Sequence, residues 1–299
     1  MSALLITGVN GQVGFELQRS LAPLGKIVAM TRAEMDLSDE ASILSVLREH
    51  RPGIIVNPAA YTAVDRAESE KEQAMAVNAT APGLLARWAA DNGAFLVHYS
   101  TDYVFDGMKE DPYVESDPVN PQSVYGESKW LGEEAVRSAG APHVILRTNW
   151  VYGHHGNNFL KTILRLAQER SALNVVADQI GAPTSAALIA DVTRRIVEVV
   201  GGPNAPDVSG TYHLSAEGTT SWHGYAAHIV REASAKNFNL ALTLDALKAI
   251  STAEYPTPAK RPQNSRLDCT KLTDCFGLRL PAWQEGVTEV IERLSPASR

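Results

Sequence analysis

The chain has little cysteine, no excess of positive charge and no long apolar run. Its two cysteines, Cys269 and Cys275, are too few for a disulfide scaffold and lack the paired Cys/His spacing of a zinc site. A net charge of −7 over 299 residues argues against nucleic acid or an anionic membrane as the main partner. No internal repeat, low-complexity tract or flexible linker interrupts the sequence.

The first residues carry no basic cluster, and only residues 3–6 form an apolar run before the first glycine. Such a run is too short for a signal peptide or a membrane span. We therefore expect a cytoplasmic protein whose first strand is buried. The apolar fraction of 44% and the charged fraction of 20% are ordinary for a soluble enzyme of one large domain or two closely joined ones.

Short apolar runs alternate with amphipathic stretches through the first half of the chain. We expect strands at 3–7, 27–30, 54–57, 95–99 and 144–147, and helices at 16–22, 41–49, 70–92 and 127–139. Apolar strands that alternate with helices indicate a parallel sheet covered on both faces. The fold class is therefore α/β, a doubly wound parallel sheet of Rossmann type, with a ligand crevice at the carboxyl ends of the strands.

Beyond residue 150 the alternation is less regular. We expect helices at 157–170 and 186–200, a loop at 178–184, a strand at 210–214 and further helices from residue 222. This pattern predicts a smaller, mainly C-terminal lobe packed against the sheet. We assign 1–150 and about 183–221 to the dinucleotide-binding domain, and about 151–182 and 222–299 to a substrate lobe.

A glycine cluster connects the first expected strand to the first expected helix. Gly8, Gly11 and Gly14 are spaced Gly-x-x-Gly-x-x-Gly, shifted from the usual Gly-x-Gly-x-x-Gly fingerprint. Backbone N–H groups at such a helix start bind anions, and the missing Cβ atoms let phosphates approach. The cluster predicts a dinucleotide site; a tight strand–helix turn without a ligand is the alternative.

The second expected strand bears on the choice of cofactor. A carboxylate at its end bonds the ribose 2′-hydroxyl of NAD, whereas an arginine accommodates the 2′-phosphate of NADP. Arg32 follows this strand and favours NADPH. An exposed arginine without a ligand is the alternative, and NADH use stays open.

Only one of the nine tyrosines, Tyr125, has a lysine four residues later, Lys129. Such a pair is weak evidence alone, because a tyrosine and a lysine at helical spacing often simply touch. Beside a dinucleotide site it has a chemical use. The phenol needs a nearby cation to release a proton at neutral pH, and Lys129 supplies that charge. Tyr125 would then act as a general acid toward a carbonyl.

A third polar group follows the expected strand 95–99. Thr101 lies at a strand carboxyl end, where it can polarise the same carbonyl. Its alternative role is to cap a turn, since Ser-Thr-Asp is also capping chemistry. With Tyr125 and Lys129 it completes the predicted catalytic set.

With these residues the chain resembles the extended short-chain dehydrogenase/reductases, over nearly its whole length. The glycine cluster and the motifs at 98–105 and 124–129 are typical of that superfamily. The match also includes 56–60, and far more specific motifs lie at 147–152, 156–159, 178–184 and 261–265. The resemblance implies NADPH-dependent reduction of the 4-keto group of a dTDP-linked 6-deoxy sugar.

The resemblance also implies roles for individual residues. Those expected at the cofactor, besides Tyr125 and Lys129, are Gly8, Asn10, Gly11, Gln12, Val13, Gly14, Arg32, Asp36, Leu37, Ala59, Ala60, Tyr61 and Asn78. Those expected at the nucleotide-sugar are Thr101, Asp102, Tyr103, Trp150, Asn157, Asn158 and Arg261. From the residues alone, Trp150 could equally be a core side chain, and Asn157 with Asn158 an ordinary turn.

Some relatives bind Mg²⁺ on carboxylates that link two subunits, and Glu16 matches the first of these. The position expected to carry a second carboxylate falls in 185–187, which reads Ser-Ala-Ala. Alanine cannot ligate a hard cation. The sequence therefore makes Mg²⁺, and any dimer that depends on it, doubtful, while a homodimer held in another way stays possible.

Two rival functions remain at this point. One is a reductase or epimerase of another nucleotide-linked sugar on the same scaffold. The other is a non-catalytic regulatory subunit, since this fold also occurs in the methionine adenosyltransferase β subunit. The intact set of Thr101, Tyr125 and Lys129 favours an enzyme.

Overall fold

A computed structural model describes residues 3–202 and 205–295. Residues 1–2, 203–204 and 296–299, which the predicted domain division includes, lie outside this description. Within the described ranges, no helix combines the length and apolar character needed to cross a bilayer.

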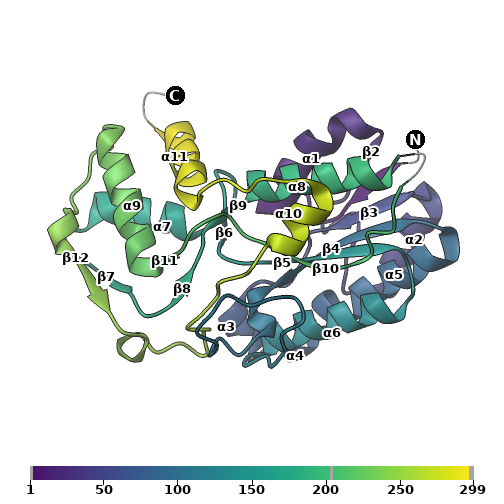
Figure 1. Ribbon diagram of the computed structural model, residues 1–299, viewed down its shortest axis with the longest axis horizontal. Helices are drawn as coiled ribbons and strands as arrows, with labels where there is room; N and C mark the ends of the chain where they lie inside the picture. The colour runs from purple at the N-terminus through teal and green to yellow at the C-terminus, as the bar shows by residue number, and fades with distance from the viewer. Residues whose placement is uncertain (1–2, 203–204, 296–299) are drawn as a thin grey trace.

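A six-stranded parallel sheet forms the centre of the molecule (Figure 1). Its spatial order is β10 (Gly210–Leu214), β5 (His143–Thr148), β4 (Phe95–Thr101), β3 (Ile54–Asn57), β1 (Leu4–Ile6) and β2 (Ile27–Ala29). All neighbouring strands run parallel. The chain order reverses between β1 and β3, and a ligand crevice is expected beyond the strand ends at such a switch point.

Helices cover both faces of the sheet, as the apolar strands require. One face carries α1 (Gln12–Leu21), α8 (Ala186–Val200) and α10 (Thr270–Phe276). The other carries α2 (Glu40–His50), α5 (Ala81–Asn92) and α6 (Val124–Ser138). This arrangement confirms the predicted doubly wound α/β fold.

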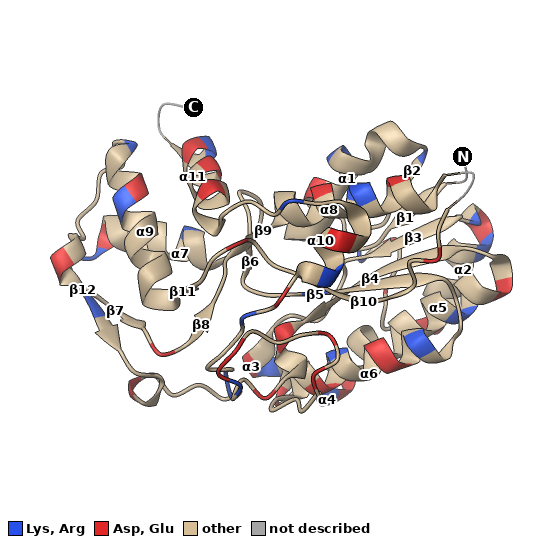
Figure 2. Cartoon of the chain, in the orientation of Figure 1, with Lys and Arg blue, Asp and Glu red and all other residues tan. Residues whose placement is uncertain are grey.

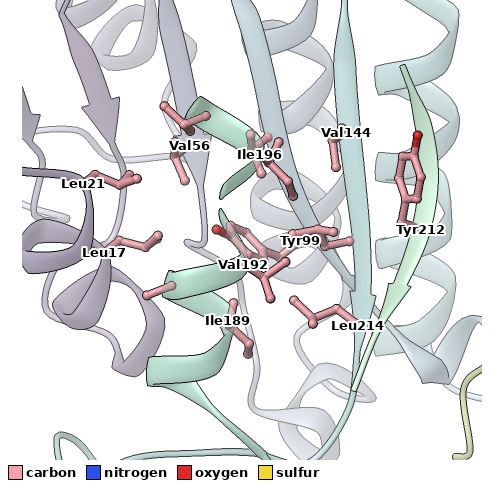
Figure 3. Packing of buried hydrophobic residues seen from close by; sticks show 14 of the residues in the cluster. Leu17, Leu21, Val56, Tyr99, Val144, Ile189, Val192, Ile196, Tyr212 and Leu214 are labelled. Atoms are coloured by element: carbon pink, nitrogen blue, oxygen red, sulfur yellow. The ribbon is translucent and has the colours of Figure 1, made fainter. Parts of the chain in front are cut away.

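The first face is closed by one apolar layer between the sheet and α1 and α8 (Figure 3). Its labelled side chains are Leu17, Leu21, Val56, Tyr99, Val144, Ile189, Val192, Ile196, Tyr212 and Leu214. Each buried leucine or isoleucine contributes about 1.5–3 kcal/mol by leaving water. This layer fixes the start of α1, and with it the glycine turn, against the end of β1.

A second, smaller unit lies beside the sheet, as predicted from the C-terminal half. Its apolar cluster joins α7 (Phe159–Glu169), α9 (Trp222–Ala235) and α11 (Trp283–Leu294). Two short strands, β7 (Leu173–Val176) and β12 (Leu247–Ile250), pair in parallel next to these helices. The unit flanks the carboxyl ends of the sheet strands (Figure 1), and the segment that leads into α7 contributes Gly156 and Asn157 to the crevice lining.

Short elements complete the connections. They are η1 (Ala22–Leu24), α3 (Val64–Ala67), α4 (Lys71–Met75), η2 (Ala76–Thr80), η3 (Asp102–Val104), β6 (Val151–Tyr152), β8 (Ile180–Gly181), β9 (Thr184–Ser185), β11 (Thr220–Ser221), η4 (Leu244–Ala246) and η5 (Thr252–Glu254).

Two predictions of local structure were incomplete. The expected helix at 70–92 is helical over 71–92, but the π-helical turn η2 separates α4 from α5 within it. The expected loop at 178–184 contains β8 and the start of β9. In the first case the reason is packing: a Cβ at Gly132 of α6 would lie 2.0 Å from the carbonyl oxygen of Asn78. The π turn thus brings two helix backbones into direct contact, which periodicity cannot reveal.

Charged side chains of both signs alternate on the outer helices (Figure 2). On α6, Arg137 lies 2.6 Å from Glu134, and on α8 Arg194 lies 2.8 Å from Glu198. Exposed pairs of this kind contribute at most about 1 kcal/mol each. We regard these faces as solvated surface rather than as binding sites.

Candidate active site

A groove of about 760 Å³ follows the carboxyl ends of the sheet strands. This volume lies within the range of about 300–1,000 Å³ typical of small-molecule sites. The groove collects most of the residues predicted from the sequence: Gly8, Asn10, Gly11, Gln12, Val13, Gly14, Arg32, Asp36, Leu37, Ala59, Ala60, Tyr61, Thr101, Asp102, Tyr103, Tyr125, Lys129, Trp150 and Asn157. Asn78, Asn158 and Arg261 do not line it.

The glycine turn between β1 and α1 has no room for side chains. Gly8 has φ +58°, and a Cβ there would lie 2.8 Å from the Cβ of Ala59. A Cβ at Gly14 would lie 2.3 Å from the carbonyl oxygen of Gly8. Gly11 occupies the N-cap position of α1 without a capping side chain. The first N–H groups of α1 therefore remain available at the groove, and the turn fits a diphosphate.

Arg32 and Asp36 lie together at the end of the groove next to β2. The Arg32 side chain is largely exposed, and its Nε is 3.9 Å from Asp36 Oδ2. Hydrogen bonds from the backbone and the hydroxyl of Ser38 lower the pKa of Asp36. This end thus offers a mobile cation for a 2′-phosphate and a fixed anion for a 2′-hydroxyl.

Tyr125 and Thr101 meet across the middle of the groove. Ser123 caps α6 by accepting from the Gly126 N–H, which places Tyr125 in the first helical turn. Thr101 is the last residue of β4. Burial raises the pKa of Tyr125, and the nearby Thr101 hydroxyl opposes that rise. The phenol is therefore fully protonated at neutral pH.

Thr101 also has the capping role given as its alternative. Its Oγ1 accepts a 3.2 Å hydrogen bond from the Tyr103 N–H and donates to Asp102 Oδ1 at 3.0 Å. The two roles are compatible, because the capping bond holds the hydroxyl toward Tyr125. Burial raises the pKa of Asp102 to about 6, although hydrogen bonds from Ser265 and Thr101 oppose the rise.

Lys129 lies one helical turn after Tyr125 and is only 2% exposed. Burial lowers the pKa of its ammonium to about 8, and the nearby carboxylate of Glu133 opposes the shift. Its Nζ lies 3.3 Å from His98 Nε2, a partner that the sequence did not reveal. The groove therefore brings three groups together. The protonated phenol of Tyr125 and the buried amine of Lys129 lie one turn apart on α6, and the hydroxyl of Thr101 lies at the end of β4.

Comparison with known proteins agrees with this geometry. A family model described as RmlD substrate binding domain matches residues 1–295. The dTDP-4-dehydrorhamnose reductase of Escherichia coli K12 is 49% identical over 295 residues, 97% of each chain. The enzyme of that name from Salmonella typhimurium is 48% identical over 97% of each chain.

Solved structures give the same result. A dTDP-4-dehydrorhamnose reductase from Clostridium acetobutylicum superposes with a TM-score of 0.90 at 35% identity, covering 98% of this chain and 99% of that one. The Bacillus anthracis reductase in complex with NADP gives 0.89 at 36% identity, covering 98% and 100%. The chain belongs to the dTDP-4-dehydrorhamnose reductase family. This match confirms the predicted family resemblance. The chain is therefore an oxidoreductase, which removes the alternative of a non-catalytic regulatory subunit.

At the far end of the groove of this reductase, Trp150 forms a flat wall. Its backbone has φ +45°, which is unusual for a bulky residue and therefore needs support from its surroundings. Trp222 supplies it, with the two rings stacked at 3.7 Å. A Cβ at Gly181 would approach the Trp150 ring to 2.7 Å, so only glycine fits behind it.

Three predicted residues are engaged outside the groove. Asn78 donates to the Tyr61 carbonyl and to Ser128, holding the loop after β3. Asn158 caps α7 and donates to the Gln12 side chain at the glycine turn, so it supports a lining residue without lining the groove itself. Arg261 pairs with Asp65 at 2.7 Å.

Arg261 nevertheless lies one side chain from the groove. Burial raises the pKa of Tyr103, a lining residue, to about 12, and the nearby charge of Arg261 opposes that rise. Its other guanidinium nitrogen, Nη1, is buried without a hydrogen-bond partner. A buried donor of this kind usually has a ligand or water, so the arginine is placed to respond to a bound anion.

Several lining residues were missed from the sequence. Thr148 is the last residue of β5 and Asn149 follows it, so the rule that predicted Thr101 also applies to both. Gln73 and Val77 come from α4 and η2, which were predicted as one continuous helix.

The surroundings of Glu16 do not fit a hard cation. Its carboxylate is 3.2 Å from Arg19, 3.1 Å from the His154 ring and 4.0 Å from Arg293. Among residues 3–202 and 205–295, no group of three or more potential ligands could hold a metal. Mg²⁺ requires oxygen ligands in near-octahedral geometry, and cationic neighbours oppose it. No step below involves a metal.

Proposed function

We propose that this enzyme reduces the 4-keto group of dTDP-4-dehydro-L-rhamnose, with NADPH, to give dTDP-L-rhamnose. The observation that carries the proposal is the convergence of Tyr125, Thr101 and Lys129 in a groove that begins at a glycine turn. The relatives named dTDP-4-dehydrorhamnose reductase and the NADP complex of one of them support the choice of substrate and cofactor.

The cofactor would be held along the first half of the groove. The N–H groups at the start of α1 face the diphosphate, with Gly8 and Gly14 leaving it room. Arg32 attracts the 2′-phosphate, and the Lys129 amine lies where a nicotinamide ribose can bond it. When bound, NADPH supplies the hydride that reduces the ketone carbon.

Tyr125 supplies the proton. Its hydroxyl donates to the ketone oxygen as that oxygen gains charge, so the C=O group becomes CH–OH and the phenolate remains on the enzyme. Because burial raises the pKa of the phenol, the donation needs a cation, and Lys129 provides it. The Thr101 hydroxyl, which donates to Asp102 in the free enzyme, would turn to donate to the same oxygen and restrain it near the phenol.

The nucleotide-sugar would occupy the second half of the groove. We place the sugar ring against the flat face of Trp150, with Asn157 toward its hydroxyls and the Tyr103–Arg261 pair toward the diphosphate. The apolar cluster of α7, α9 and α11 supports this half. It underlies the division proposed here: 1–150 and about 183–221 for the cofactor, about 151–182 and 222–299 for the substrate.

A turnover assay with a panel of nucleotide-linked 4-ketosugars tests the proposal. We expect NADPH oxidation with the dTDP-linked sugar to exceed that with GDP- or UDP-linked sugars, and dTDP-L-rhamnose as the product. A different preferred base, or an epimer formed without net cofactor oxidation, would establish the rival reductase or epimerase instead. Parallel assays with NADH decide the cofactor.

A further inference from the structure

Behind Lys129 a chain of buried polar side chains runs through the sheet, away from the groove. Lys129 Nζ lies 3.3 Å from His98 Nε2, and His98 Nδ1 lies 3.2 Å from Asn57 Nδ2. Asn57 Oδ1 in turn accepts from the Thr7 hydroxyl at 2.6 Å. The four side chains come from α6, β4, β3 and the end of β1, and all are buried. Of the four, only Lys129 lines the groove.

His98 is neutral in this chain. Burial holds the pKa of its imidazole well below the ordinary range, and the charges of Lys129 and His143 lower it further. The charged groups around the pair are Glu133 and Lys129 from α6 and His143 from β5. Glu133 is itself held by Arg147 at 2.7 Å and Arg137 at 3.1 Å. No carboxylate therefore bonds His98 directly in the described contacts.

A neutral imidazole has one N–H donor and one acceptor nitrogen. If Lys129 is an ammonium, it can only donate, so His98 Nε2 must accept and Nδ1 must carry the proton. Nδ1 then needs the oxygen of the Asn57 amide opposite it. If Lys129 is a free amine, Nε2 can carry the proton and Nδ1 can accept from the Asn57 amide nitrogen, which is the arrangement present here.

We propose that His98 is a positioning residue whose tautomer follows the charge of Lys129. In the ammonium state its Nε2 accepts from Nζ; in the amine state its Nε2–H donates to Nζ. A half-turn of the Asn57 amide exchanges that residue's donor and acceptor to match. His98 thereby bonds Lys129 in both protonation states and holds the amine at one place beside Tyr125. The catalytic consequence of this inference rests on the proposed function; the tautomer change does not.

NMR of the wild-type enzyme labelled with ¹⁵N at its histidine rings tests the tautomer directly. Below pH 7, we expect the His98 proton on Nδ1; above pH 9.5, we expect it on Nε2. The change should follow the titration of Lys129, without a doubly protonated form between. A single tautomer across the range, or an imidazolium that forms near pH 6, would overturn the proposal.

Two variants test the effect on catalysis. His98→Phe removes the bond to Lys129 in both protonation states. The bond to the ammonium is charge-assisted and roughly twice as strong as the bond to the neutral amine, and the difference is worth about one pH unit in the pKa of Lys129. The high-pH limb of the kcat/KM profile, where activity falls as Lys129 loses its proton, should therefore lie about one pH unit lower. His98→Gln keeps an amide oxygen toward Nζ and should leave that limb nearer its wild-type position.

A matched control is His213→Gln, because His213 is equally buried and bonds the Tyr113 carbonyl at 3.0 Å instead of a catalytic group. It should leave the high-pH limb unmoved.

A uniform loss of kcat in His98→Phe without a shift of that limb would show a merely structural role and contradict the proposal. If His98→Phe does not fold, the His98→Gln profile and the wild-type NMR still decide. If no 4-ketosugar is reduced, the proposed function fails, and the NMR titration tests the tautomer independently.

Discussion

Replacing Lys129 by methionine should make the protein more stable and inactive at the same time. The ammonium is 2% exposed, and burial lowers its pKa from 10.5 to about 8. The unfolded chain therefore binds the proton more tightly than the folded one. This difference destabilises the fold below pH 8, and the cost is relieved as pH rises from 8 toward 10.5.

The magnitude follows from the size of the shift. A change of two to three pKa units corresponds to about 3 kcal/mol at pH 7. Methionine has a similar length and no charge, but it loses the bond between Nζ and His98, worth about 1 kcal/mol. We expect Lys129→Met to raise the free energy of unfolding by about 2 kcal/mol at pH 7. In a chain of 299 residues that is a rise in Tm of about 3 °C.

The assay is thermal unfolding at pH 7 and at pH 10, together with turnover. The stabilisation should be largest at pH 7 and shrink at pH 10, where the wild-type lysine is already neutral. Lys71→Met is the matched control: Lys71 is exposed and pairs with Glu127 at the surface, so its loss should change stability by less than about 1 kcal/mol. An inactive Lys129→Met that unfolds below the wild-type temperature at pH 7 would refute the linkage argument.

Three further substitutions probe other parts of the groove. Tyr125→Phe removes the proton donor and should lower kcat by about 10²–10⁴ while the Kd for NADPH, measured by fluorescence titration, stays nearly unchanged. Gly14→Ala places a Cβ 2.3 Å from the Gly8 carbonyl oxygen and should abolish NADPH binding. Gly202→Ala is the control and should not, because its Cβ would lie 3.6 Å from the Val199 carbonyl oxygen. Arg32→Ala should raise KM for NADPH about tenfold, and KM for NADH little, because only NADPH has the 2′-phosphate.

The sheet and its covering helices could be predicted because their sequence pattern reflects the physics directly. Strand 54–57, helix 186–200 and strand 210–214 were each predicted with the bounds that the structure has. In each, an apolar run or a helical stripe ends at a turn signal, and the buried face decides the structure. The π turn at Ala76–Thr80 could not be predicted in this way, because a backbone contact with Gly132 determines it.

The groove residues that follow a strand could be predicted from the sequence. Contacts between residues that are distant in the chain could not. Thr101 and the glycine turn lie at strand ends, so topology alone brings them together. His98 and Asn57 lie within strands and face the same interior, yet nothing in their spacing of 41 residues links them to Lys129. Trp222 is similar: it supports Trp150 from a helix that lies 72 residues later. Such contacts depend on packing between units and not on local pattern.

The proposed reaction and the role of Tyr125 are tested most directly by the oxidation of NADPH in the presence of dTDP-4-dehydro-L-rhamnose, compared between the wild-type enzyme and Tyr125→Phe. We predict stoichiometric formation of dTDP-L-rhamnose by the wild type and a loss of at least about a hundredfold in kcat for the variant. Equal turnover by the two proteins would contradict the assignment of Tyr125 as the proton donor. No turnover by the wild type with this sugar would contradict the proposed reaction.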